Sequence, residues 1–221
     1  MQNLIRVPGP AGSGKTTLYD LLIQSLNLLG LEKNIVISAQ SEYKVNNIQE
    51  DLKESKAKGV KYNALYSLIS NLKQKNALYT LLEEKVLDLY FKKLAEINKK
   101  DSLILEDLKE TFGTIEVKKG KDNTRIITFT GTSDQYKGLN VTYTIYNNSL
   151  SDFIVDFSDS WFTDVKPAQS LENGLLIIDE CTNLSSFEWE ALSKIAKDQK
   201  ASIFATGDNV QRGYSIKITN Q

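Results

Sequence analysis

The chain has 221 residues, of which 41% are hydrophobic and 25% charged, and its formal net charge is −1. This is an ordinary globular composition; the near-neutral charge argues against an extended basic coat, and the absence of histidine excludes His-based triads and His metal sites. The single cysteine excludes an intrachain disulfide, and no apolar run approaches the roughly 20 residues of a membrane span, so we expect a cytoplasmic protein in a reducing compartment with no membrane partner.

The chain opens with a predicted strand over residues 3–7, a glycine-rich loop and a predicted helix over residues 15–29. The loop reads GPAGSGKTT and satisfies the pattern G-x-x-x-x-G-K-[ST] from Gly9 to Thr16. Glycines let backbone N–H groups converge on an anion, and the following helix directs its N-terminal dipole to the same place. We predict that Lys15 reaches the β- and γ-phosphates of a nucleotide and that Thr16 gives its hydroxyl to Mg²⁺. The residues predicted to bind the nucleotide are Gly9, Gly12, Ser13, Gly14, Lys15, Thr16 and Thr17.

A second β-rich run covers residues 34–39, and residues 42–58 have a polar, helical pattern. This order of strand, loop, helix and strand predicts a parallel sheet, because parallel strands need a crossover connection. Residues 63–97 are Leu-rich at helical spacing, and residues 102–112 form a further candidate helix. Over residues 114–148 the composition shifts to Thr, Ile, Val and Tyr, which predicts two or three antiparallel strands in a β-rich insertion.

A second chemical motif follows the apolar run in NGLLIIDE (173–180), which has the pattern of a central parallel strand. Ligands of open α/β sheets bind at the carboxyl ends of the strands. We predict that Asp179 contributes to the Mg²⁺ shell and that Glu180 acts as a general base or positions the attacking water. Taken alone, these residues are equally consistent with a strand that ends in an acidic turn.

The last predicted elements are a helix over residues 186–198 and a strand over residues 201–208. The strand runs into ATGDNVQ (205–211), which ends in Gln211. A glutamine beside the γ-phosphate can report whether that phosphate is present, so we assign Gln211 a catalytic role together with Lys15 and Glu180. The alternative for this segment is a Gly-Asp turn that carries a surface glutamine.

Together, the three motifs resemble those of the first RecA-like domain of a superfamily 1 helicase. GPAGSGKTT resembles motif I of that family, and IIDECTNLS resembles motif II, with its acidic pair at Asp179 and Glu180. GDNVQ resembles motif III, in which Gly207, Asp208 and Gln211 match.

Two weaker matches lie between motifs I and II. Residues 35–52 stand where motif Ia of the family touches the backbone of single-stranded DNA. Residues 62–69, YNALYSLI, stand where the family often has a Thr-x-His-Ser-Leu segment, but Ala64 replaces the threonine and Tyr66 replaces the histidine.

The resemblance implies an α/β, RecA-like P-loop NTPase fold with a parallel central sheet flanked by helices and a small β-rich insertion. It implies that residues 1–112 form the first part of the RecA-like domain with motifs I and Ia, residues 113–150 the insertion or accessory subdomain, and residues 151–221 the second part with motifs II and III. It also implies ATP and Mg²⁺ as cofactors, single-stranded nucleic acid as a partner, with DNA in preference to RNA, and a second RecA-like domain.

Motifs IV to VI of the family, which include the arginine that completes hydrolysis, have no match here. The chain has only three arginines, Arg6, Arg125 and Arg212. We therefore expect a fragment of a longer helicase, or a domain that meets its second half elsewhere. Such a domain is expected to hydrolyse ATP slowly by itself, since a missing arginine finger costs roughly 10³–10⁵ in rate.

Lysines and tyrosines near motif Ia offer one candidate surface for a nucleic acid strand, because single-strand binding pairs cationic groups with stacking aromatics. The alternative is a solvated helix face of mixed lysines and acidic residues. Trp161, Phe162 and Trp189 could stack on bases, although such aromatics are more typical of a core. The candidate surface consists of Tyr43, Lys44, Lys53, Lys56, Lys58, Lys61 and Tyr62.

Two other functions stay open at the level of sequence. A small P-loop kinase would suit the chain length, but it needs an Arg-rich lid over the phosphates, and arginine is scarce here. A nucleotide-gated interaction module would bind ATP with little chemistry. Nucleic acid that stimulates phosphate release would favour the motor, transfer to a small acceptor the kinase, and binding without turnover the module.

Overall fold

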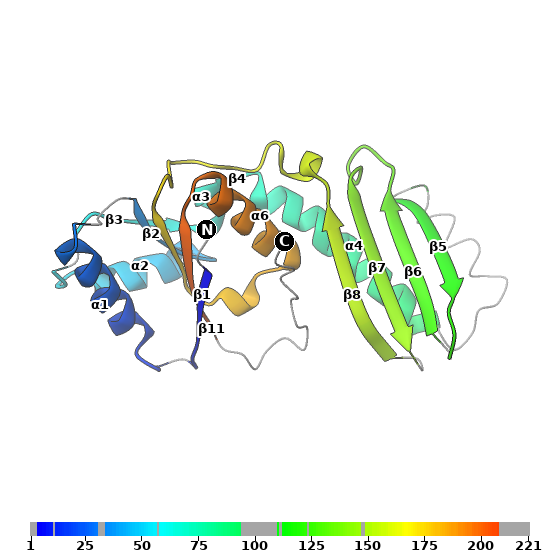
Figure 1. The fold of residues 1–221 in the computed structure, drawn as a ribbon, viewed down its shortest axis with the longest axis horizontal. Coiled ribbons are helices and arrows are strands. Elements are labelled where there is room, and N and C mark those ends of the chain that lie inside the picture. Colours follow the sequence, from blue (N-terminus) through cyan, green and yellow to red (C-terminus); the bar gives the residue numbers. More distant parts are fainter. Residues whose placement is uncertain are drawn as a thin grey trace. The chain divides into compact units, whose positions relative to one another are not determined.

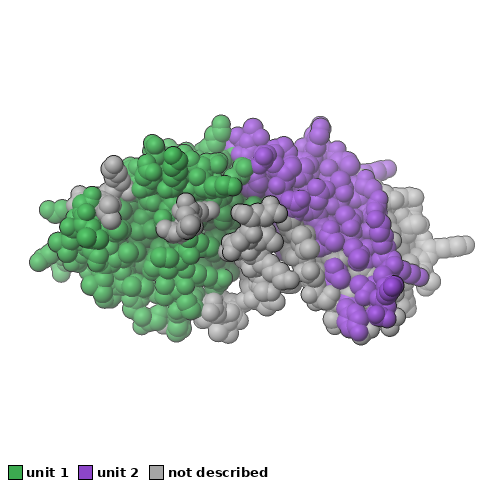
Figure 2. Space-filling model, viewed as in Figure 1, with its two compact units in different colours: residues 1–72, 165–221 green, residues 73–164 purple. Residues whose placement is uncertain are grey.

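The computed structural model forms two compact units, which Figure 2 distinguishes by colour. One unit comprises residues 1–72 and 165–221, and the other comprises residues 73–164. The structure describes residues 4–10, 12–30, 34–56, 58–93, 110, 112–122, 124–146 and 149–207.

The first unit is built on a five-stranded parallel sheet in the order β1-β11-β10-β2-β3 (Figure 1). This confirms the predicted α/β fold with a parallel central sheet. The strands are β1 (Leu4–Pro8), β2 (Ile35–Ala39), β3 (Val60–Ala64), β10 (Leu175–Ile178) and β11 (Ser202–Gly207). The apolar runs of β2 and β10 are explained by their central places, because a central strand of a parallel sheet is covered on both faces.

Helices cover both faces of this sheet. The connections through α1 (Lys15–Leu28) and α2 (Glu42–Asp51) advance along the sheet in one direction, and the connection through α6 (Ser186–Asp198) advances in the other. Right-handed crossovers therefore place α1 and α2 on one face and α6 on the opposite face, as Figure 1 shows. The core between α1, α2 and the sheet contains Tyr19, Ile23, Ile35, Ile37, Ile48, Leu52, Ile177 and Phe204.

Local sequence signals explain where α2 and α6 begin. Ser41 is the N-cap of α2, and its hydroxyl accepts a hydrogen bond from the backbone N–H of Lys44. Ser185 and Glu188 form a capping box at the start of α6, in which each side chain accepts from the backbone N–H of the other residue. Shorter elements complete the unit: α3 (Leu65–Leu68), the pair β4 (Ile69–Ser70) and β9 (Lys166–Pro167), and the 3₁₀ turn η2 (Cys181–Asn183).

The second unit contains α4 (Leu72–Lys93, of which Leu72 lies in the first unit), a four-stranded antiparallel sheet and the 3₁₀ turn η1 (Asp159–Phe162). Three of its strands lie within residues 113–146, in agreement with the prediction of two or three antiparallel strands over residues 114–148, and a fourth strand extends the sheet beyond that range. The fourth strand follows the Asn147-Asn148 segment, pairs with its predecessor and continues to Phe157, beyond the expected insertion boundary at residue 150. The strands are β5 (Gly113–Lys119), β6 (Thr124–Gly131), β7 (Leu139–Tyr146) and β8 (Ser149–Phe157).

The aromatic residues that could have stacked on bases belong to the core. Trp161 is 1% exposed and Phe162 and Trp189 are each 8% exposed. In the second unit, Trp161 packs against Tyr136, and the Tyr136 hydroxyl donates to the Leu78 carbonyl of α4 over 3.0 Å. Burial of apolar surface is thus the main role of these rings.

Several predicted features lie outside the described residues. These are most of the candidate helix over residues 102–112 and the positions after Gly207, including Asp208, Gln211 and Arg212. In the part of the chain that the structure describes, no helix is both long and apolar enough to cross a membrane.

Candidate nucleotide-binding site

The glycine-rich loop connects the end of β1 to the start of α1. Gly12 and Gly14 have φ angles of 78° and 79°, in the left-handed region where a side chain would be strained. The loop is fastened at its start by a 3.0 Å hydrogen bond from the Gly9 N–H to the carbonyl of Gly207 at the end of β11. Gly12, Ser13 and Gly14 are exposed, so their backbone is open to an incoming anion.

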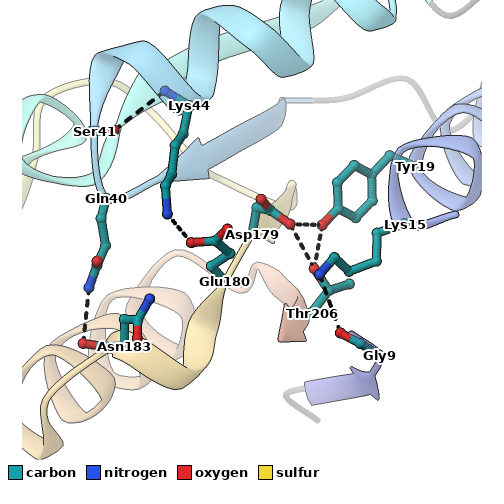
Figure 3. Close-up of polar contacts among 10 residues, drawn as sticks. All are labelled: Gly9, Lys15, Tyr19, Gln40, Ser41, Lys44, Asp179, Glu180, Asn183 and Thr206. Atoms are coloured by element: carbon teal, nitrogen blue, oxygen red, sulfur yellow. Dashed lines mark hydrogen bonds and ion pairs between the residues drawn. The ribbon is translucent and has the colours of Figure 1, made fainter. Parts of the chain in front are cut away.

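Lys15 begins α1, and its side chain reaches back over this loop. Its ammonium donates to the Gly9 carbonyl over 3.3 Å, so the charge lies at the loop rather than in bulk solvent (Figure 3). A hollow of about 300 Å³ opens beside the first turns of α1. Its lining residues are Thr16, Thr17, Asp20, Asp51 and Leu52.

Asp179 directly follows β10 and is held by two hydroxyl groups. Tyr19 of α1 donates to Oδ1 over 2.6 Å, and Thr206 of β11 donates to the same oxygen over 3.1 Å. The two hydroxyl oxygens also contact each other, which completes the triangle shown in Figure 3. The backbone N–H of Asp179 donates to the Ser38 carbonyl of β2 over 2.9 Å, which fixes the main chain at the same point.

The phenol of Tyr19 is a permanent donor in this network. Tyr19 is fully buried, and burial together with the hydrogen bond to Asp179 raises the pKa of its hydroxyl above the ordinary value of 10.0. The hydroxyl therefore keeps its proton at any pH at which the protein is expected to work.

Glu180, the next residue, has a left-handed backbone with φ 53° and ψ 44°. Such a conformation is costly for a residue with a side chain, and it turns Glu180 away from the direction of the strand. Its carboxylate forms an ion pair with Lys44 of α2 (Figure 3). Nearby, Gln40 donates to the Asn183 carbonyl over 2.9 Å. This hydrogen bond and the Lys44 ion pair join residues 40–44 to Glu180 and to the turn that follows it.

The structure thus brings the first two predicted motifs to one end of the sheet. Tyr19 lies one helical turn after Lys15, and it contacts Asp179, while Gly9 contacts Gly207. Figure 3 shows Lys15, Asp179 and Thr206 facing the same region. Gln211, the third residue assigned a catalytic role, lies outside the described residues.

Three residues of this site were not identified from the sequence. Tyr19 and Thr206 hold Asp179, and Lys44 was expected only as part of a surface for nucleic acid. The available signals were the spacing of four residues from Lys15 to Tyr19 and the position of Thr206 directly before motif III. Neither signal predicts a contact with Asp179 unless the fold that brings these residues together is already known.

The other residues of the candidate surface have varied environments. Tyr43 is 75% exposed, so its ring is accessible, whereas Lys53 forms an exposed ion pair with Glu50.

Tyr66, which stands where the helicase segment has histidine, donates to the buried Glu188 carboxylate over 2.6 Å. Tyr66 therefore stabilises the first turn of α6 through this hydrogen bond to Glu188.

The residues present fit a nucleotide with a divalent cation. Exposed backbone and a lysine suit the phosphates, and one carboxylate with one hydroxyl suits Mg²⁺, which keeps several waters and shares phosphate oxygens. Among the described residues no group of three or more Cys, Asp or Glu side chains could hold a metal alone. A cation at this site would therefore depend on Thr16, Asp179 and the phosphates together.

A comparison with models of protein families agrees with this geometry. No curated protein matches the chain. The family model described as AAA domain matches residues 1–217, which is nearly the whole sequence. The chain therefore belongs to the AAA domain family, and its glycine-rich loop and parallel sheet are those of a P-loop nucleotide-binding domain.

Proposed function

We propose that the chain is an ATP-binding and ATP-hydrolysing motor domain of a superfamily 1-like helicase or translocase. The observation that supports this proposal best is the network around Asp179. It joins the helix after the glycine-rich loop, the strand of the acidic pair and the strand that leads to Gly207. Three segments far apart in the sequence thereby meet where a nucleoside triphosphate would lie.

The site residues have distinct roles in this proposal. Lys15 and the backbone of the loop bind and orient the phosphates. Thr16 and Asp179 hold Mg²⁺, which neutralises charge on the phosphates when it is bound. Glu180 positions the attacking water or accepts its proton, and Gln211 senses the γ-phosphate.

Single-stranded nucleic acid, DNA in preference to RNA, is the proposed polymer. The accessible Tyr43 ring can stack on a base. The neighbouring Lys44 is paired with Glu180, so it would have to leave that pair to contact the nucleic acid backbone. A second RecA-like domain, in the same polypeptide or in trans, is the proposed source of the arginine that completes hydrolysis. Without it we expect slow turnover.

Two substitutions test the nucleotide site directly. Lys15→Ala is expected to weaken ATP binding strongly in a calorimetric titration, because the fixed cation at the loop is lost. Glu180→Gln is expected to keep ATP binding and abolish phosphate release, because only the water-positioning group changes. Lys197→Ala, at an exposed position in the last turn of α6, is the matched control.

The outcomes separate the candidate functions. Unchanged ATP affinity in Lys15→Ala would remove the phosphate-loop assignment. Retained turnover in Glu180→Gln would assign the water to another residue. Phosphate transfer to a small acceptor, insensitive to an oligonucleotide, would identify a kinase, and binding without any turnover would identify a nucleotide-gated module.

A further inference from the structure

Asp179 differs from an ordinary surface carboxylate because both of its hydrogen-bond donors converge on one oxygen. The Tyr19 and Thr206 hydroxyls both donate to Oδ1, at 2.6 Å and 3.1 Å. Among the described residues, no hydrogen bond engages Oδ2. The two donors come from different elements, Tyr19 from α1 and Thr206 from β11.

Both donors are themselves held rigidly. Tyr19 and Thr206 are each fully buried. The Tyr19 ring packs edge-on against Phe204, with 6.5 Å between ring centroids, in the core between α1 and the sheet. Hydrogen bonds in such a dry environment are stronger than at a surface, so they can fix the rotation of the Asp179 side chain.

We propose that Tyr19 and Thr206 are positioning residues that orient Asp179, so that Oδ2 is directed to the cation of a bound nucleotide. This inference rests on the proposed binding of ATP with Mg²⁺. Tyr19 follows Lys15 by four residues, so the two lie on the same face of α1. One rigid helix therefore carries both the group for the phosphates and the group that orients the metal ligand.

Conservative variants can separate this role from packing. Tyr19→Phe keeps the buried ring and removes only the hydroxyl. Thr206→Val keeps the shape of the side chain and removes the second donor. Tyr66→Phe is the matched control, because it also removes a phenol that donates to a carboxylate over 2.6 Å, but that carboxylate is Glu188 at the start of α6.

The experiment measures binding and needs no catalysis. ATP affinity of the full chain is determined by calorimetry across a Mg²⁺ series and in EDTA. Mg²⁺ is expected to enhance the ATP affinity of the wild type. Tyr19→Phe and Thr206→Val are each expected to raise, by about tenfold, the Mg²⁺ concentration that gives half of this enhancement, which is the usual cost of losing a residue that orients a metal ligand. Affinity in EDTA is expected to change less than about twofold, because the loop and Lys15 are intact, and Tyr66→Phe should leave both quantities unchanged.

A mutant cycle with Asp179→Ala completes the test. Tyr19→Phe should have no further effect on the Mg²⁺ requirement once Asp179 is absent, because the hydroxyl acts through that carboxylate. An unchanged Mg²⁺ requirement in Tyr19→Phe and Thr206→Val, with a clear effect of Asp179→Ala, would overturn the positioning role and leave the nucleotide site standing. Equal losses with and without Mg²⁺ would show that the hydroxyls only support the fold, and no ATP binding by the wild type would refute both proposals.

Discussion

Replacing Lys44 by alanine is expected to raise the basal rate of ATP hydrolysis. Lys44 forms an ion pair with Glu180, the residue proposed to position the attacking water. This pair directs the carboxylate toward α2 and occupies an oxygen that would otherwise contact the water. Removal of the ammonium leaves Glu180 free to act on the water.

The size of the effect follows from the exposure of the pair. Both side chains are 39% exposed, so solvent and salt screen their attraction. Pairs of this kind contribute about 0.2–1 kcal/mol. Losing that energy corresponds to an increase of about 1.4- to 5-fold in the ratio of unpaired to paired Glu180. We therefore expect the basal rate to rise by no more than about fivefold, with unchanged ATP affinity.

The assay is steady-state phosphate release at saturating ATP and Mg²⁺, at low and high salt. High salt should raise the rate of the wild type and reduce the difference from Lys44→Ala, because it weakens the pair. Lys53→Ala is the matched control, since Lys53 lies just after the same helix but pairs with Glu50, and it should match the wild type. A lower rate in Lys44→Ala at equal ATP affinity would refute the reasoning and make Lys44 an aid to catalysis.

Three further predictions concern stability and reactivity. Above pH 10 the unfolded chain loses the Tyr19 proton while the folded chain keeps it, so the free energy of unfolding should fall by up to about 1.4 kcal/mol per pH unit. In urea unfolding measured above pH 10, this fall should be less steep in Tyr19→Phe than in the wild type. Ser185→Ala removes the capping box with Glu188 and should cost about 1 kcal/mol in urea unfolding; a change within error would mean that the box is redundant. Cys181 is fully buried and burial raises the pKa of its thiol, an effect that Arg6 opposes, so iodoacetamide should label it only as the protein unfolds, and rapid labelling of native protein would contradict its burial.

The parts of this protein that the sequence determined are those whose physics is local. Left-handed glycines next to Lys15 define the phosphate loop within a few residues, and the apolar run before Asp179 defines a buried strand that ends in an acidic pair. The helix over residues 186–198 has the bounds that its periodicity predicts. In each case the pattern itself requires the structure.

Only the tertiary structure decided which side chains meet. Tyr19 and Asp179 are 160 residues apart in sequence, and their hydrogen bond depends on the order of the strands and on the packing of α1. The same holds for Lys44, whose charge could serve a solvated helix face or an ion pair with Glu180, and for Trp161, which could be exposed or buried. Periodicity describes one element at a time, whereas the partner of a side chain is chosen by the arrangement that buries the most apolar surface and leaves the fewest polar groups unpaired.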